Sequence, residues 1–363
     1  MVDTQCDAGT TDSALQILLS SHSALQNVVA FIGPDCGEAA KTAAAATAAD
    51  GRAFPIISAG ATASSLSNSS IYPTFTRVVP ASNIYDTSVL YAAAKYSWAT
   101  KTQNRAGIVF TAPDSMGEEA AAAMNETAKM LGINIIAGAS FPRNSSADIV
   151  LSAVAVLQQS SVETVIIAAP VPETRGVFAA IATLRANESH WAPRMILSNE
   201  AIGAESQNFP ATLNGAQGYL TVLPGPYPLC STTAAFNAKF PGANRWATFA
   251  YDSVLLLAYA VAAAVAEADE QKNEVTPAAV SAQLRLVTVL DGVTGKIYIL
   301  PGTNDRGGAT RLEVMNLQGE NVTAQHDFAV VGECICDAAT YPPLTAHVFH
   351  GEIQWPPFAS SSI

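Results

Sequence analysis

Two consecutive strand-turn-helix units near the start of the chain constrain its fold more than any other part of the sequence. The apolar, β-branched run Val28–Ile32 ends at a Gly-Pro turn, and the Ala-rich stretch Glu38–Asp50 follows it. Phe54–Ser58 is a second strand-type run, and the turn Gly60–Thr62 leads from it to a helix start at Ser64–Ser67. Strands that alternate with helices in this way predict a parallel α/β sheet.

The turns of these two units are expected where an open α/β sheet binds ligands, at the carboxyl ends of its strands. Helix N-termini at this edge offer unpaired N–H groups to an anion, so the place suits a carboxylate. Any doubly wound protein has turns of this kind, and the pattern alone therefore leaves a purely structural role open.

A second series of alternating elements begins at Arg105. The expected elements are strand 105–111, helix 117–131, strand 133–141, helix 147–159, strand 164–169, helix 173–186 and strand 194–198. The alternation predicts a second parallel sheet. Ala247–Asp269 is then expected to form a long helix and Pro277 to begin another, since proline suits a first helical turn.

Three motifs carry a family resemblance: IGPDCG at residues 32–37, PIISAGATASSLS at 55–67 and YPTFTRVVPAS at 72–82. They resemble the ligand-binding region shared by class C G-protein-coupled receptors, natriuretic-peptide-type receptors and bacterial leucine/isoleucine/valine-binding proteins. Among these, the GABA-B-like receptors are the most similar. The resemblance implies a type I periplasmic-binding-protein fold, in which a hinge of several crossings joins two Rossmann-like lobes with parallel sheets flanked by helices.

This fold implies a division of the chain into lobes. We expect lobe 1 to comprise residues 1–102 and 226–289, lobe 2 to comprise 103–225 and 290–335, and residues 336–363 to form a linker-like C-terminal tail. The family begins with a strand and a helix before the segment that residues 2–7 match, so we expect these two elements to be missing from this sequence.

The resemblance also assigns candidate ligand-binding residues in lobe 1. In amino-acid-binding members, a Ser after the first-turn Cys and groups of the second turn hold the ligand carboxylate. The corresponding positions here are Gly37 in the first turn and Gly60, Ala61 and Thr62 in the second. Gly37 keeps its N–H group but lacks a hydroxyl, so one hydrogen bond is lost or taken by water. Thr62 can also serve as a helix N-cap.

In lobe 2, the family supplies an acidic residue for the ligand ammonium, and Glu200 falls at that place. A carboxylate in a cleft pairs well with a cation, although a solvated loop Glu remains the alternative. Met116 and Pro170 stand where the family often carries aromatic rings, which removes stacking or cation–π contacts. We therefore do not expect GABA, glutamate or leucine to bind tightly.

Five cysteines and five glycosylation sequons bear on the compartment. The resemblance implies a disulfide between Cys6 and Cys36, hence an oxidising environment, and leaves Cys230, Cys334 and Cys336 open. With Ser and Thr this common, roughly half of the Asn-x-Ser/Thr sequons could arise by chance, but their spread fits a glycosylated ectodomain. The sequons lie at Asn68, Asn125, Asn144, Asn187 and Asn321.

Composition excludes several functions. A net charge of −12 and a pI near 4.8 argue against a nucleic-acid partner, because no basic patch is available for phosphates. The sequence contains no HExxH, GxSxG, Walker or GxGxxG motif, and its cysteine spacing gives no zinc pattern. We expect no enzymatic activity, no cofactor and no bound metal.

The strongest apolar run, Val254–Ala266, is shorter than a membrane span needs, and Met1–Asp3 shows no signal peptide. The resemblance and the linker-like tail predict the extracellular ligand-binding domain of a cell-surface membrane receptor, anchored by a segment absent from this sequence. Its ligand would be a small polar molecule, amino-acid-like or carboxylate-bearing. The alternative is a periplasmic-type solute-binding protein of an amino-acid transporter. The sequence leaves open whether two copies of the chain form a dimer through lobe 1.

Overall fold

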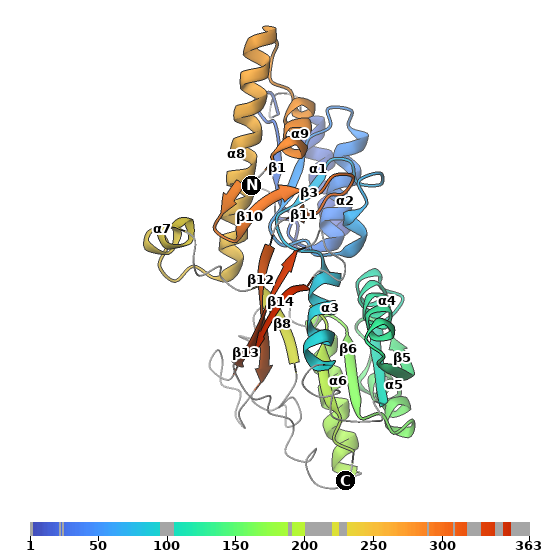
Figure 1. Cartoon of the computed structure of the whole chain (residues 1–363). Coiled ribbons are helices and arrows are strands. Elements are labelled where there is room, and N and C mark those ends of the chain that lie inside the picture. Colours follow the sequence, from blue (N-terminus) through green and yellow to red (C-terminus); the bar gives the residue numbers. More distant parts are fainter. Residues whose placement is uncertain are drawn as a thin grey trace. The chain divides into compact units, whose positions relative to one another are not determined.

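The computed structural model describes residues 3–21, 23, 25–94, 105–187, 191–199, 220–224, 231–288, 290–307, 309–317, 328–337 and 344–349 (Figure 1). The chain divides into two compact units. Unit 1 comprises Met1–Ala81, Pro224–Arg311 and Ile335–Thr345, and unit 2 comprises Ser82–Leu223, Leu312–Cys334 and Ala346–Ile363. The predicted lobes differ from these units mainly over residues 82–102 and 290–311, and their boundaries stay a prediction.

The first part of unit 1 is a three-stranded parallel sheet with helices beside it. The sheet has the order β1-β2-β3, and Phe31 pairs with Ile56, which pairs in turn with Phe75. The elements are α1 (Ala8–Ser20), β1 (Phe31–Ile32), α2 (Gly37–Ala49), β2 (Ile56–Ser58), the 3₁₀ helix η1 (Ser64–Ser67) and β3 (Phe75–Arg77). The strand-turn-helix units predicted from the sequence are thus present, with shorter strands than expected.

Alanine side chains let α2 lie close to this sheet. Ala40, Ala43 and Ala44 recur on one face of α2 and form a core with Ile56 and Phe75. Residues on i, i+3 and i+4 share one face of a helix, so an Ala-rich stretch with this spacing buries a flat surface. Ala61, Ala63 and Leu66 of the second turn belong to the same core.

The later part of unit 1 contains the longest helix and a small antiparallel sheet of order β11-β10-β9. Asn244 accepts a hydrogen bond from the N–H of Ala247 and caps α8, while Thr276 caps α9 and Pro277 fills its first turn. The elements are α7 (Ser231–Lys239), α8 (Arg245–Gln271), α9 (Pro277–Leu286), β9 (Leu290–Gly292), β10 (Gly295–Ile299) and β11 (Arg306–Gly307).

Helix α8 has 27 residues, and among the described helices it is the one long and apolar enough to cross a membrane by length and composition. The expectation that no apolar segment is long enough is therefore wrong on length, because the helix extends beyond the run that was counted. Asp252 of this helix is fully buried and accepts hydrogen bonds from Val293 and Thr294. Core helices of soluble proteins pass the same length test, and these contacts are those of a core helix.

Unit 2 is built on a larger sheet. Its strands β5, β4, β6, β7 and β8 are neighbours in this order and run parallel, and the sheet continues through β12, β13 and β14. The strands are β4 (Arg105–Thr111), β5 (Asn134–Phe141), β6 (Thr164–Ala168), β7 (Arg194–Leu197), β8 (Leu220–Pro224), β12 (Ala309–Leu317), β13 (Phe328–Asp337) and β14 (Leu344–Phe349). Strand β14 lies in the segment expected to be a linker.

The helices of unit 2 cover both faces of its sheet (Figure 1). They are α3 (Ser82–Ala93), α4 (Ser115–Met130), α5 (Ala147–Gln159) and α6 (Val171–Asn187). The chain passes from β4 to β5 through α4. It then crosses the sheet in the opposite direction, through α5 to β6 and through α6 to β7. Because such crossovers are right-handed, α4 packs on one face with α3, and α5 and α6 pack together on the other.

The reversal of strand order in unit 2 lies between β4 and β6, which are neighbours in the sheet but not in sequence. Open parallel sheets bind ligands outside the carboxyl ends of their strands at such a switch point. The residues that follow β4 and β6 therefore mark one candidate edge, and the turns that follow β1 and β2 mark another in unit 1.

Candidate ligand-binding site

The two predicted turns of unit 1 lie against each other. A Cβ atom built on Gly37 would lie 3.0 Å from Cβ of Ala63, and one built on Gly60 would lie 2.8 Å from Cβ of Asp35. Gly60 therefore allows a backbone approach that any larger residue would block. The structure brings together Gly37, Gly60, Ala61 and Thr62, the four positions that the sequence resemblance assigned to lobe 1.

Ser58 and Asp35 fix the backbone between these turns. The Ser58 hydroxyl accepts from the N–H groups of Gly60 (3.3 Å) and Ala61 (2.9 Å), and it lies 2.8 Å from the carbonyl oxygen of Pro34, to which it donates. Oδ1 of Asp35 accepts from the N–H of Ala59 at 3.0 Å. Sequence reasoning missed both residues, although each stands inside a quoted motif next to a predicted position.

Thr62 is 8 % exposed and stands between Ala61 and Ala63, whose side chains are buried in the core of unit 1. Its neighbours on both sides thus hold the backbone in place. Thr62 therefore stands on a rigid support, which a small-ligand site requires.

The N-terminus of α2 contributes partial positive charge to the same place. Cys36 is the N-cap residue, makes no side-chain cap hydrogen bond, and is joined to Cys6 by a disulfide with a Cα–Cα distance of 5.3 Å. Two acidic side chains, Asp35 and Glu38, flank this helix start, and Glu38 pairs with Lys41 at 3.0 Å. The helix dipole favours an anion, and the Asp35 charge opposes one.

In unit 2, the predicted residues Met116 and Pro170 follow β4 and β6, the two strands at the switch point. Arg143, in the loop after β5, donates from Nε to Oδ2 of Asp114 at 2.9 Å and from Nη2 to the sulfur of Met116 at 3.2 Å. A guanidinium group therefore lies beside Met116, where the family often has an aromatic ring. Nothing in the sequence marked Arg143 as a site residue, because it lies in a loop without a recognisable motif.

Asp114 is the N-cap residue of α4 but makes no side-chain cap hydrogen bond. Its Oδ2 instead accepts from the Thr111 hydroxyl at 2.7 Å and from Arg143. The Asp114 carboxylate therefore orients Arg143 and does not cap the helix. The missing cap costs about 1 kcal/mol of helix stability. Glu173 accepts from the N–H of Asn144 at 3.2 Å and holds the same loop from the start of α6.

Glu200, the predicted partner of a ligand ammonium, lies outside the described residues. The segment that leads to it is well anchored, since the N–H of Asn199 donates to Oδ1 of the fully buried Asp86 at 3.0 Å. Asp86 belongs to α3, so this helix fixes the end of β7. The role of Glu200 stays a prediction.

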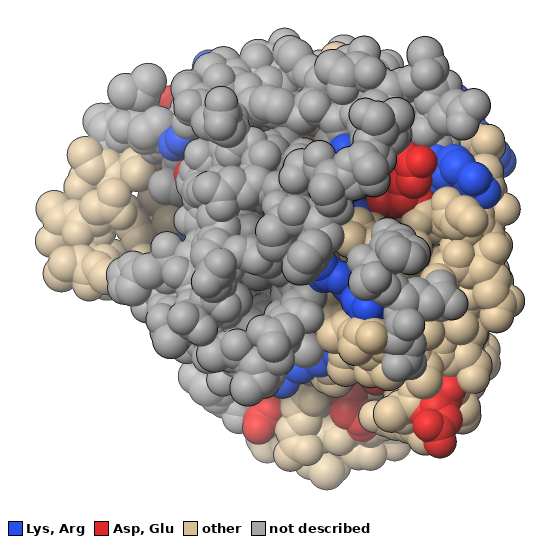
Figure 2. Space-filling view, turned by 90° about the horizontal axis from the view of Figure 1, so that it is seen from below, with Lys and Arg blue, Asp and Glu red and all other residues tan. Residues whose placement is uncertain are grey.

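The remaining predicted positions are placed as follows. Asn68 and Asn144 are exposed and Asn125 is half-buried; the side chain of Asn187 and all of Asn321 lie outside the described residues. Within the described part of the chain, no group of three His, Cys, Asp or Glu side chains could hold a metal ion. In Figure 2, the described surface is mostly uncharged, and its acidic and basic residues lie in small separate groups.

Two α/β units with parallel sheets, each with its candidate edge at the carboxyl ends of the strands, define the class of type I periplasmic-binding-protein folds. The family model described as "Receptor family ligand binding region" matches residues 1–320. The chain therefore belongs to this family. No curated protein matches it by sequence.

Two solved structures from Desulfitobacterium hafniense have the same fold. An ABC transporter substrate-binding protein of this organism has a TM-score of 0.65 and 17% identity, over 90% of this chain and 87% of that one. The crystal structure of such a protein in complex with Leu has a TM-score of 0.64 and 18% identity, over 88% of this chain and 85% of that one. At this identity, the likeness shows the fold alone.

Proposed function

We propose that the chain is the extracellular ligand-binding domain of a membrane receptor and binds a small polar, carboxylate-bearing molecule between its two lobes. The observation that carries this proposal is the close approach of the two turns of unit 1, where Gly37, Gly60, Ala61 and Thr62 lie together at the carboxyl ends of β1 and β2. The Cys6–Cys36 disulfide supports an oxidising, extracellular compartment.

In this proposal, the ligand carboxylate lies at the start of α2 and against Thr62. The helix dipole favours the carboxylate by about 1 kcal/mol in a partly buried geometry. Asp35 lies at the same turn, so a ligand with a neighbouring ammonium group, which offsets the Asp35 charge, fits better than a simple carboxylate. Glu200 would bind this or a second cationic group.

Lobe 2 selects against ordinary α-amino acids in this proposal. Met116 and Pro170 provide no ring for stacking, and Arg143 adds a cation beside Met116. A ligand with a second acceptor group on this side gains a hydrogen bond to the guanidinium, and an aliphatic side chain does not.

The second candidate function is a periplasmic-type solute-binding protein of an amino-acid transporter. Its support is the likeness in fold to ABC transporter substrate-binding proteins, one of them in complex with Leu. Sequencing of the complete coding region separates the two functions. The receptor proposal expects a membrane-spanning segment downstream of residue 363, and a lipoprotein or secretion signal upstream of a chain without such a segment would support the transporter protein.

The first prediction tests the ligand site by calorimetry over a panel of amino acids, polyamines and small carboxylates. Thr62→Ala and Glu200→Gln are each expected to weaken the tightest-binding compound at least tenfold, a loss of about 1.4 kcal/mol. Thr183→Ala and Glu126→Gln change the same residue types on exposed faces of α6 and α4 and should bind like the wild type. If a compound binds and neither site variant weakens it tenfold, the proposed site is wrong.

A further inference from the structure

The hydrogen-bond partners of an arginine separate a structural role from a ligand-binding one. A guanidinium group has five N–H donors in a fixed plane and no acceptor, so an arginine of the core needs an acceptor for each donor. Where the protein supplies only some of these acceptors, the remaining donors are available to water or to a ligand. The two cases occur in Arg77 of unit 1 and Arg143 of unit 2.

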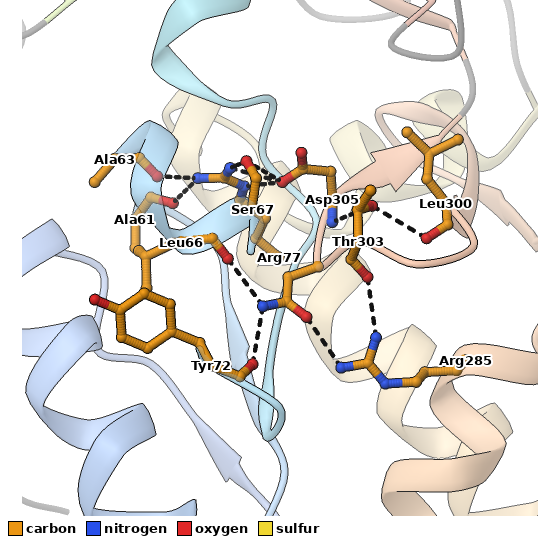
Figure 3. A network of polar contacts seen from close by, with 11 residues as sticks. Ala61, Ala63, Leu66, Ser67, Tyr72, Arg77, Arg285, Leu300, Thr303 and Asp305 are labelled. Carbon is orange, nitrogen blue, oxygen red and sulfur yellow. Dashed lines mark hydrogen bonds and ion pairs between the residues drawn. The ribbon is translucent and has the colours of Figure 1, made fainter. Parts of the chain in front are cut away.

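Arg77 is the structural case. It is fully buried at the end of β3, and Figure 3 shows the acceptors around it. Nη1 donates to the carbonyl oxygens of Ala61 (3.1 Å) and Ala63 (2.8 Å). Nε donates to Oδ1 of Asp305 at 2.8 Å, and Nη2 lies 2.6 Å from the same oxygen and 2.5 Å from the Ser67 hydroxyl. All five donors are used, so Arg77 joins parts of unit 1 and offers no donor to a ligand.

Arg143 has fewer partners. Nε donates to Oδ2 of Asp114 at 2.9 Å, and Nη2 donates to the sulfur of Met116 at 3.2 Å. A thioether sulfur is a weak acceptor. In the part of the chain that the structure describes, both donors of Nη1 and one donor of Nη2 therefore have no protein partner.

The direction of Arg143 is nevertheless fixed. The side chain of Asp114 is only 8 % exposed, and its Oδ2 also accepts from the hydroxyl of the buried Thr111 in β4 at 2.7 Å. The backbone next to Arg143 is held as well, because the N–H of Asn144 donates to Glu173 at 3.2 Å. The guanidinium group thus has a rigid support on one side and open donors on the other.

This support costs more than a structural role of Arg143 would return. The side chain of Arg143 is 40 % exposed, and an ion pair of a partly exposed arginine contributes little to stability. Holding an arginine in one direction also costs side-chain entropy. Asp114 holds it with a carboxylate that leaves the start of α4 uncapped. These costs are offset if the open donors must keep one direction in order to bind a ligand.

The position of Arg143 in the sheet agrees with this role. Arg143 follows β5, and Met116 lies in the helix that follows β4, one of the two strands at the switch point. The N–H of Ala112 donates to the carbonyl oxygen of Phe141 at 3.0 Å, so the ends of β4 and β5 lie side by side. Open parallel sheets bind ligands outside the carboxyl ends of their strands.

The open donors also determine which chemical group they bind. Nη1 and Nη2 of one guanidinium group form two parallel hydrogen bonds to the oxygens of one carboxylate. An amide has one oxygen and turns N–H donors toward the guanidinium donors, and an ammonium group is repelled. The open side of Arg143 therefore favours a carboxylate over its amide.

We propose that Arg143, oriented by Asp114, is a specificity-determining residue that binds a second carboxylate of the ligand and thereby discriminates a dicarboxylate from its monoamide. The inference rests on the proposed function, which places the first carboxylate at the turns of unit 1. A purely structural arginine would change the melting temperature and the affinity for both compounds, whereas a specificity-determining residue changes the ratio of the two affinities.

The test is calorimetric titration of the full chain with malonate, succinate, glutarate and adipate, each compared with its monoamide. The monoamide keeps one carboxylate and the shape of the molecule and replaces only the second carboxylate. Neither compound of a pair has an amino group, so the charge of Asp35 opposes both. We expect wild type to bind the tightest-binding dicarboxylate at least tenfold more tightly than its monoamide.

Arg143→Gln removes the guanidinium group and should reduce this ratio to less than threefold, while the affinity for the monoamide stays within twofold of wild type. Arg143→Lys keeps a charge beside Asp114 but has no fork of donors, so it should lower the ratio at least threefold. It gives a second reading if Arg143→Gln does not fold. Arg105→Gln is the matched control and should keep the full ratio. Arg105 is exposed at the opposite end of β4 and donates to the Ser160 carbonyl at 2.6 Å.

The inference is overturned if no dicarboxylate binds wild type more tightly than its monoamide. It is also overturned if the folded variant, Arg143→Gln or otherwise Arg143→Lys, keeps the ratio of wild type or weakens both compounds equally. Thr62→Ala tests the proposed function separately, and it should weaken both compounds at least tenfold without changing their ratio. If Arg143→Gln removes the ratio and Thr62→Ala changes neither affinity, the inference stands and the anion site proposed in unit 1 is wrong.

Discussion

At the scale of single residues, the first two turns combine attraction and repulsion for an anion. The N-terminus of α2 attracts negative charge, while Asp35 places a carboxylate beside Gly60. Oδ1 of Asp35 accepts the N–H of Ala59, so the residue has a structural role that its amide counterpart can keep. The charge of Asp35 and its hydrogen bond can therefore be tested separately.

Asp35→Asn is expected to raise the affinity for a simple carboxylate, one without an ammonium group, about fivefold, or about 1 kcal/mol, because a like charge is removed while the acceptor for Ala59 is kept. Glu38→Gln is the control, since Glu38 already pairs with Lys41 and should change affinity by less than twofold. Calorimetric titration with a simple carboxylate of the panel measures both. A fall in the affinity of Asp35→Asn for this carboxylate would contradict the repulsion by Asp35.

The Cys6–Cys36 disulfide closes a loop with a sequence separation of 30 residues. On the chain-entropy account, which is model-dependent, such a loop contributes about 3–4 kcal/mol to the free energy of unfolding. In denaturant unfolding, the double variant Cys6→Ser/Cys36→Ser should have a free energy of unfolding lower by this amount. A reductant should not lower it further through this disulfide. Equal stability of the double variant and the wild type would contradict the prediction.

At the scale of elements, Asp252 connects helix α8 to the turn between β9 and β10. Its carboxylate accepts from the N–H groups of Val293 (2.7 Å) and Thr294 (2.9 Å) and from the Thr294 hydroxyl at 2.5 Å. Burial raises the pKa of Asp252 above 3.8, and the hydrogen bonds from Thr294 and Val293 and the charge of Arg306 oppose this rise. The folded protein therefore keeps this proton to a higher pH than the unfolded chain does.

Asp252→Asn should lower the free energy of unfolding at pH 7 by about 2 kcal/mol, since the amide nitrogen cannot accept from Thr294. Because the folded pKa is raised, the contribution of Asp252 is greatest below about pH 3.8 and falls as pH rises through the folded pKa. The gap between wild type and variant should thus widen as pH is lowered from 7 toward 4. Asp269→Asn, on the exposed face of α8, should show no such widening, and a constant gap for Asp252→Asn would contradict the argument.

The alternation of apolar strands and helices was sufficient to predict most elements. Strand 105–111 and helix 147–159 have the predicted bounds, because local periodicity determines them. The strand expected at Val28–Ile32 is reduced to Phe31–Ile32, since its length depends on pairing with β2. Arg77 and Asp305 could not be paired from the sequence, because 228 residues separate them and only the tertiary fold brings them together.

At the scale of the whole molecule, the chain crosses between its two units several times, as the family fold implies. In the proposed function, these crossings act as a hinge that lets the two units close on a ligand. The rigid parts are the cores of the units, while the proposed ligand contacts come from the turns after β1 and β2 and from those after β4 and β6. In this proposal, a ligand held by both units would bring them together.

The most direct test of this account is small-angle X-ray scattering of the chain with and without the panel compound that binds most tightly. We expect the radius of gyration to fall on saturation of the wild type, and Thr62→Ala to reach the same value only at a concentration at least tenfold higher. A radius of gyration that stays unchanged while calorimetry shows the site to be saturated would contradict ligand binding between the two lobes.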